Sequence, residues 1–175
     1  MATYKIDPAH SEIIFKVRHL VISTVSGNFS KFDATMECNK PDFTDAVITF
    51  EADVNSVSTN SADRDTHLKG DDFFNAEKYP KITFKSTSIE KKGDDEYVLH
   101  GDITIRDITK NIALDVTHGG SVIDSWGQNK EGFELRGKIS RKEFNLKWNA
   151  LTEAGGAIAG DEVRLVLNVQ MIKQA

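Results

Sequence analysis

The chain has 175 residues, a formal net charge of −5 at pH 7 and a hydrophobic content of 39%. This length suits one domain that buries most of its apolar surface, so residues 1–175 are predicted to form a single domain. Lysine and arginine are scattered along the chain, which argues against nucleic acid as a partner because phosphate binding needs a concentrated basic face. The only cysteine is Cys38, which excludes an internal disulfide and a zinc site built from several cysteines.

The N-terminal segment does not resemble a secretion signal. Its first eight residues contain no apolar stretch of the required length, and no later run could span a bilayer. We therefore expect a cytoplasmic protein without membrane insertion. If Met1 is instead a start placed on a mature exported protein, the expected compartment is the periplasm.

Eight segments show the two-residue alternation of apolar and polar side chains that is typical of a half-buried strand. In chain order they are 11–19, 28–37, 46–54, 82–86, 97–105, 112–118, 133–139 and 163–171. A change of phase between Phe29 and Phe32 indicates an irregularity near Ser30. The stretch 119–130, which contains Trp126, is predicted to be a loop, and 141–151 is predicted to be irregular.

One segment is predicted to be helical. Residues 62–69 should form a short helix, with Asn60 or Ser61 as the N-cap and Gly70 at the end. Phe73 and Phe74 follow it in a loop. This segment would deliver apolar bulk to the open end of a closed sheet, so we expect it to be a lid or plug.

Short turns join most of the predicted strands, which favours antiparallel pairing of sequence neighbours. Strands of this length are long for a sandwich, and closure of the sheet removes exposed edges. We therefore predict an all-β protein, an eight-stranded antiparallel barrel with one short helix near residues 62–69 and an internal hydrophobic tunnel.

Several sequence blocks resemble those of the YceI-like family and occur in its order over almost the whole chain. They are Ile6-Asp7-Pro8-Ala9-His10-Ser11, Phe15-Lys16-Val17-Arg18-His19-Leu20, Arg64-Asp65-x-His67-Leu68, Asp72-Phe73-Phe74, Tyr79-Pro80-x-Ile82-x-Phe84-Lys85-Ser86, Gly101-Asp102-Ile103-Thr104-Ile105, Ser140-Arg141-Lys142-x-Phe144-x-Leu146-x-Trp148-Asn149 and Gly160-Asp161-Glu162-Val163. The family commonly has glycine where Asp107 and Asn145 stand here. Both replacements tolerate the left-handed backbone conformation, so the turns should be preserved.

The resemblance implies an extended, lipocalin-like barrel that encloses a polyisoprenoid or similar long amphiphile, has no established catalytic activity and is often a dimer. We accordingly expect a lipid ligand, no cofactor and a homodimer. The predicted tunnel lining is Phe15, Val17, Phe29, Ile48, Phe50, Phe73, Phe74, Ile82, Phe84, Leu99, Ile103, Leu114, Val116, Phe133, Leu135, Phe144, Trp148, Leu165, Leu167 and Val169. A barrel filled by these side chains is the alternative, because eight strands leave room for either arrangement.

Three polar residues are candidates for contact with a ligand headgroup. His19 is in phase with the inward residues of its strand and should lie near a strand end. Arg64 and His67 are three residues apart and so share one face of the predicted helix. The alternatives are that His19 is an ordinary hydrogen-bonded core residue and that Arg64 or His67 pairs with Asp65 or a neighbouring strand.

Other site chemistries have weaker support in the sequence. The spacing of His10, His19 and His67 matches no metal-binding motif, so we expect no metal site. A hydrolase or isomerase using His19, His67 and Asp65 on an enclosed lipid is a competing hypothesis. The sequence lacks a Gly-x-Ser-x-Gly nucleophile motif, which disfavours it.

Overall fold

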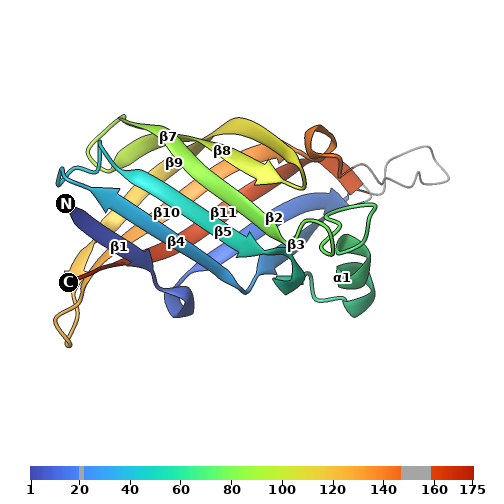
Figure 1. The fold of residues 1–175 in the computed structure, drawn as a ribbon, viewed down its shortest axis with the longest axis horizontal. Coiled ribbons are helices and arrows are strands. Elements are labelled where there is room, and N and C mark those ends of the chain that lie inside the picture. The colour runs from blue at the N-terminus through green and yellow to red at the C-terminus, as the bar shows by residue number, and fades with distance from the viewer. Residues whose placement is uncertain (20–21, 147–158) are drawn as a thin grey trace.

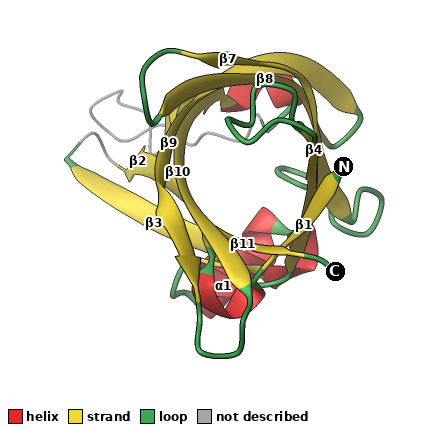
Figure 2. Ribbon diagram, turned by 90° about the vertical axis from the view of Figure 1, so that its left-hand side faces the viewer, coloured by secondary structure: helices red, strands yellow, loops and turns green. Residues whose placement is uncertain are grey.

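The computed structural model describes residues 1–19, 22–146 and 159–175. Within them, one antiparallel sheet closes on itself where β1 pairs with β11 (Figures 1 and 2). Its strands are β1 Ala2–Ile6, β2 Glu12–His19, β3 Ser23–Phe29, β4 Phe32–Cys38, β5 Val47–Asp53, β6 Val57–Ser58, β7 Lys81–Lys91, β8 Glu96–Ile105, β9 Ile108–Ile123, β10 Asn129–Ser140 and β11 Ala159–Lys173. The helical elements are η1 Pro8–His10, η2 Val54–Ser56, α1 Ala62–Leu68 and η3 Arg141–Phe144.

Six of these strands combine in sequence order into three composite strands, β1–β2, β3–β4 and β5–β6. The two parts of a composite strand run along the same neighbouring strand. The composite strand β1–β2 lies beside β11, because β11 pairs with both of its parts. On its other side lies β3–β4, since β1 pairs with β4 and β2 with β3; beyond that lies β5–β6, since β4 pairs with β5 and β3 with β6. The wall of the barrel therefore has eight strands, which confirms the predicted fold class.

The break in the first composite strand has a local cause. Pro8 cannot donate a backbone hydrogen bond, and a proline within a sheet therefore interrupts the ladder. The Asp7 carboxylate accepts a hydrogen bond from Ala9 N at 3.1 Å and so caps η1. Asp7 N donates to Gln170 O at 2.8 Å, and Gln170 N donates to Ser11 Oγ at 3.0 Å. Both sides of the break thus stay attached to β11.

The two ends of the barrel are built differently. Helix α1 lies at one end, and the chain termini lie at the other (Figure 1). The predicted N-cap residue Ser61 accepts a hydrogen bond from Arg64 N at 3.3 Å. At the corner between β8 and β9, Arg106 Nη1 donates to Phe73 O at 2.8 Å and to Asn145 O at 3.2 Å, so this one side chain ties the loop after α1 to η3.

Several elements differ from the sequence predictions. The predicted strand 28–37 is divided between β3, which already begins at Ser23, and β4, and the predicted strand 82–86 extends to Lys91. Strand β1 was not predicted, because its alternation involves only Tyr4 and Ile6 before Pro8 ends it; both side chains are buried. The predicted loop 119–130 is much shorter, because β9 extends to Ile123 and β10 begins at Asn129. The predicted irregularity near Ser30 corresponds to the gap between β3 and β4.

Two glycines lie beneath aromatic rings, and they should respond differently to substitution. A Cβ at Gly101 would lie 2.2 Å from Phe84 Cζ and 2.7 Å from the backbone oxygen of Lys85, whereas the three atoms nearest a Cβ at Gly27 would all belong to the Phe15 ring, the first at 2.3 Å. We expect Gly101→Ala to lower the free energy of unfolding by about 1–3 kcal/mol, because the backbone must shift. Gly27→Ala should cost less, because the Phe15 ring can swing away. Urea denaturation of both variants tests this, and equal losses would contradict it.

A candidate ligand-binding cavity

The barrel encloses a cavity of about 550 Å³, lined almost entirely by apolar side chains. Most of the residues predicted from the sequence lie on its wall. They are Phe15, Val17, Phe29, Ile48, Phe50, Phe73, Phe74, Ile82, Phe84, Leu99, Ile103, Leu114, Val116, Phe133, Leu135, Leu165, Leu167 and Val169, together with the polar candidates Arg64 and His67. Inward-facing positions of successive strands thus meet in one chamber, as strand alternation requires.

Among the described residues, one predicted lining residue is absent from this wall. Phe144 is 1% exposed and packs in the hydrophobic core, so its expected place on the tunnel lining is corrected. It belongs to η3, where the alternation of a strand does not determine which way a side chain points. Trp148 lies outside the described residues. His19 ends β2, pairing with Ser23 and Ala159, but its side chain also lies outside what the structure describes.

Sequence reasoning missed other residues of the wall. Ile13, Ala34 and Met36 line the cavity and follow the same alternation as their predicted neighbours, so a signal for them was present. Phe43 lies in the connection between β4 and β5 and Arg141 begins η3, so the alternation of a strand could not have identified them.

Polar side chains of the lining gather at one end of the cavity. Apart from Tyr97 at the start of β8, they are Arg18, Thr59, Asp63, Arg64, His67 and Arg141. Arg18 lies near the end of β2, Thr59 follows β6, three residues belong to α1, and Arg141 begins η3. The cavity therefore has a polar end beside α1 and an apolar remainder.

A hydrogen-bonded group fixes Arg64 at this polar end. Its Nε donates to Thr59 Oγ1 at 2.7 Å, and its Nη2 donates to Thr59 O. Asp65 Oδ1 accepts hydrogen bonds from Thr59 N at 2.8 Å and from Thr59 Oγ1 at 2.6 Å. Arg64 thus has a structural partner, Thr59, where the alternative interpretation expected Asp65 or a neighbouring strand, and it also lines the cavity.

His67 is held by the loop that follows α1. Its Nε2 lies 3.3 Å from Asp72 Oδ2, and its ring meets that of Phe73 edge-on with 5.1 Å between centroids. The side chain remains 40% exposed. His67 therefore lies between solvent and the cavity, paired with Asp72.

Among the described residues, Arg141 is the most deeply buried cation at the polar end, with 3% exposure. Its Nε donates to Gly160 O and its Nη1 donates to Leu146 O, both at 2.7 Å. Burial lowers the pKa of the guanidinium, and the nearby Asp161 carboxylate opposes this effect. Arginine stays protonated in proteins, so a fixed positive charge lies at this end.

Asp161 should make stability depend on pH in the acid range. Burial tends to raise its pKa, but hydrogen bonds from Ser140 Oγ at 2.7 Å and Lys142 N at 3.1 Å outweigh this and hold the pKa below the ordinary value of an aspartate. A carboxyl group whose pKa is lower in the folded protein than in the unfolded chain stabilises the fold. This stabilisation is fully present at pH values above the pKa of the unfolded chain, and it is lost as the pH falls through the pKa of the folded protein.

We expect the melting temperature of the Asp161→Asn variant to fall less steeply than that of the wild type as pH drops below about 4. Melting curves recorded across this range test the prediction. Parallel pH profiles for the two proteins would contradict it.

Aromatic side chains gather at the opposite end of the cavity. Phe43 is 5% exposed, and its ring centroid lies 5.4 Å from that of Phe133 and 6.3 Å from that of Tyr4. Its backbone has a φ of 63°, which is strained for a bulky residue. Burial of the ring in this cluster offsets that strain.

A second polar cluster lies near this aromatic end but does not line the cavity. His118 Nε2 is 2.8 Å from Glu131 Oε2, which also accepts a hydrogen bond from Ser121 Oγ. Glu131 therefore lies between the serine and the histidine, so His118 is not positioned as a base for Ser121. Among the described residues, no group of three or more histidine, cysteine or acidic side chains could hold a metal ion.

Together, the closed barrel and its one-ended polarity define a protein that encloses an apolar chamber with one polar end. Residues 4–171 match the family model described as a YceI-like domain. The protein named YceI from Escherichia coli O157:H7 is 38% identical over 175 residues, covering 99% of this chain and 88% of that protein. The chain belongs to the YceI-like family, which confirms the resemblance.

Solved structures agree on the fold. The Campylobacter jejuni YceI protein is 32% identical with a TM-score of 0.77, and the match covers 90% of each chain. Burkholderia cenocepacia BcnA has a TM-score of 0.82 at 22% identity, covering 94% of this chain and 98% of that one. A polyisoprenoid-binding domain from Saccharophagus degradans has a TM-score of 0.70 at 13% identity, covering 98% of both chains. In the described part of the chain, no helix has the length and apolar character needed to cross a membrane.

Proposed function

We propose that the protein is a non-catalytic binding protein that stores or transports a long-chain amphiphile. The ligand class is a polyisoprenoid, an isoprenoid quinone or a fatty-acid-like lipid, and no cofactor is needed. The observation that supports this function is the polarity of the cavity: among the described residues, every polar side chain of the lining except Tyr97 lies at the end beside α1. The tail would lie along the barrel and the headgroup near Arg64 and His67. The polyisoprenoid-binding domain with the same fold agrees with this class.

The size and surface of the cavity are sufficient for such a ligand. A volume of about 550 Å³ falls within the usual range for small-molecule sites. Each buried CH2 contributes up to about 0.8 kcal/mol, so roughly fifteen give about 12 kcal/mol before association and ordering costs. Hydrocarbon burial alone could therefore support micromolar or tighter binding.

The competing functions have less support. A filled barrel would leave no chamber of this volume. For an enzyme using His19, His67 and Asp65, the carboxylate of Asp65 should orient a histidine, but it accepts hydrogen bonds from Thr59 while His67 pairs with Asp72. We keep the homodimer as an expectation, which sedimentation analysis would test.

The direct test is mass spectrometry of an organic extract of freshly purified protein, beside native mass spectrometry of the same sample. We expect a stoichiometric long-chain lipid. A protein that is empty and also fails to take up a quinone or a prenyl lipid would overturn the proposed function.

The placement of the headgroup has its own test. The double variant Arg64→Ala and His67→Ala should weaken binding of a headgroup-bearing prenyl lipid by roughly tenfold or more, because charge-assisted hydrogen bonds are lost. Binding of the bare hydrocarbon should be unchanged. Lys142→Ala is the matched control, since Lys142 lies in η3 at the same end of the barrel but does not line the cavity. Equal losses for both ligands would refute this placement.

A further inference from the structure

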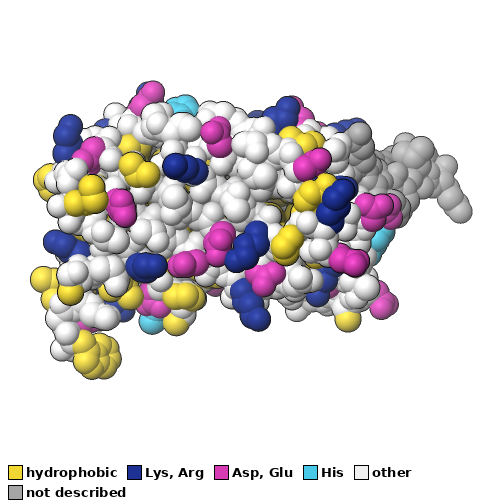
Figure 3. All heavy atoms as spheres, viewed as in Figure 1, with side chains coloured by type: hydrophobic (Ala, Val, Ile, Leu, Met, Phe, Trp, Pro, Cys, Tyr) yellow, Lys and Arg dark blue, Asp and Glu magenta, His cyan; other side chains and the backbone are white. Residues whose placement is uncertain are grey.

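The hairpin between β9 and β10 presents an unusual group of exposed apolar side chains. Val122, Ile123 and Trp126 are 59%, 71% and 85% exposed. Successive strand residues point to opposite faces, so exposure of both Val122 and Ile123 means that neither face of the hairpin is covered here. The tip projects from the barrel at the lower left of Figure 1, and the same projection bears hydrophobic side chains in Figure 3.

The tip is held in a defined shape. Asp124 Oδ1 accepts hydrogen bonds from Trp126 N and Gln128 N, both at 2.9 Å, and Asp124 N donates to Gln128 O at 3.0 Å. Gly127 adopts a φ of 79°, which suits the tight turn. These bonds hold the backbone around Trp126, so its exposed indole is presented from an ordered turn.

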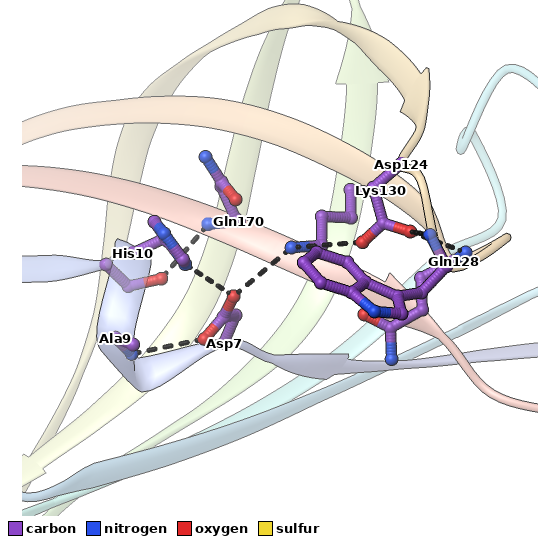
Figure 4. Close-up of polar contacts among 9 residues, drawn as sticks. Asp7, Ala9, His10, Asp124, Gln128, Lys130 and Gln170 are labelled. Carbon is purple, nitrogen blue, oxygen red and sulfur yellow. Dashed lines mark hydrogen bonds and ion pairs between the residues drawn. The ribbon is translucent and has the colours of Figure 1, made fainter.

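An ion-pair group fastens this turn to the barrel. Lys130 Nζ lies 3.5 Å from Asp124 Oδ2 and 3.7 Å from Asp7 Oδ2, and Asp7 also pairs with His10 at 2.8 Å (Figure 4). These contacts link the hairpin to the break between β1 and β2. Hydrogen bonds from Gln128 N and Trp126 N help to keep the pKa of Asp124 low, so its charge faces Lys130 and the turn.

The chemistry of the tip selects one kind of partner. Asp124 is the only charged residue from 119 to 129, and its carboxylate is engaged within the hairpin, so the exposed side chains of the tip are apolar or polar without charge. A stable protein interface buries about 800 Å² on each partner, more than three side chains on a convex tip can supply. A small convex tip can instead insert among the lipids of a bilayer, and tryptophan side chains favour the interface between membrane and water.

We propose that this apolar tip, formed by Val122, Ile123 and Trp126, docks the protein peripherally on the surface of a lipid bilayer. The contact requires no charged lipid, because the tip offers no free charge. It goes beyond the proposed binding function and does not depend on it, since docking involves residues outside the cavity.

The test is co-flotation of the full chain with extruded vesicles of neutral phosphatidylcholine. The wild type should float with the vesicles at both low and high salt. The double variant Ile123→Ser and Trp126→Ser should lower the partition coefficient at least about tenfold. Ile22→Ser is the matched control: Ile22 is 83% exposed but lies in the turn between β2 and β3, at the opposite end of the barrel, and its replacement should change nothing.

Three outcomes would overturn docking. These are a wild type that does not float, a tip variant that floats as well as the wild type, and binding that needs anionic lipid and disappears in salt. A tip-dependent dimer in sedimentation, without flotation, would assign the surface to a second copy instead. The tip variant should still retain lipid in its cavity. Flotation therefore tests the docking inference, and lipid retention separately tests the proposed binding function.

Discussion

Leu165→Asp should abolish retention of an apolar ligand while leaving the barrel folded. Leu165 lies on β11 opposite Phe15 of β2 and Gly137 of β10, and it lines the cavity. In the empty protein, water entering the chamber can hydrate a carboxylate there. A hydrocarbon chain would displace that water and leave the charge in an apolar environment, so affinity should fall by roughly 100-fold or more.

Asn168→Asp is the matched control for this experiment. It places the same charge on the same strand at an exposed position outside the cavity, and it should retain ligand at the wild-type level. Far-ultraviolet circular dichroism and melting curves check folding, and extraction followed by mass spectrometry measures retention. A folded Leu165→Asp protein that copurifies the same lipid in the same amount would show that the ligand does not occupy the barrel.

Arg141→Leu should cause a large loss of stability, with the free energy of unfolding falling by about 2–4 kcal/mol. The substitution removes the donors to Gly160 O and Leu146 O. Leucine avoids the cost of burying a charge but cannot satisfy these carbonyl groups, and each unsatisfied buried group costs about 1–3 kcal/mol.

Urea unfolding of Arg141→Leu, Arg141→Lys and Lys142→Ala tests this explanation. Lysine keeps the charge but lacks the planar fork that serves two acceptors, so we expect an intermediate loss. Lys142 is exposed and adjacent, and its side-chain truncation should change little. If Arg141→Leu were as stable as the wild type, water would have to satisfy both carbonyl groups, and the role assigned to Arg141 would be wrong.

Strand alternation predicted most of the cavity wall because a period of two fixes which side chains enter a barrel. Phe15 and Val17 share one face of β2, and their partners across the sheet follow from pairing. The same rule failed where backbone geometry leaves the strand pattern. Phe144 in η3 points into the core, and Phe43 reaches the cavity from a turn with positive φ.

The polar end of the cavity was only partly predictable. Helical spacing placed Arg64 and His67 on one face of α1, and both line the cavity. Thr59 and Arg141 could not be assigned, because their positions depend on how α1 and η3 are packed against the barrel end. The exposed tip could not be predicted either. The two glycines before Val122 are typical of a loop, although β9 continues through them.

The closure of the barrel has a consequence for how the chain folds. Most strands pair with a neighbour in sequence, so hairpins can form with short loops and little entropic cost. The seam is different: β1 meets β11, and Tyr4 pairs with Lys173. Pairing of β1 with β11 closes a loop that contains nearly the whole chain. Such non-local pairing forms slowly, because the entropic cost of closing the loop comes before the gain from the contacts. We expect a curled, open sheet to precede the closed barrel during folding, with its two free edges joining last.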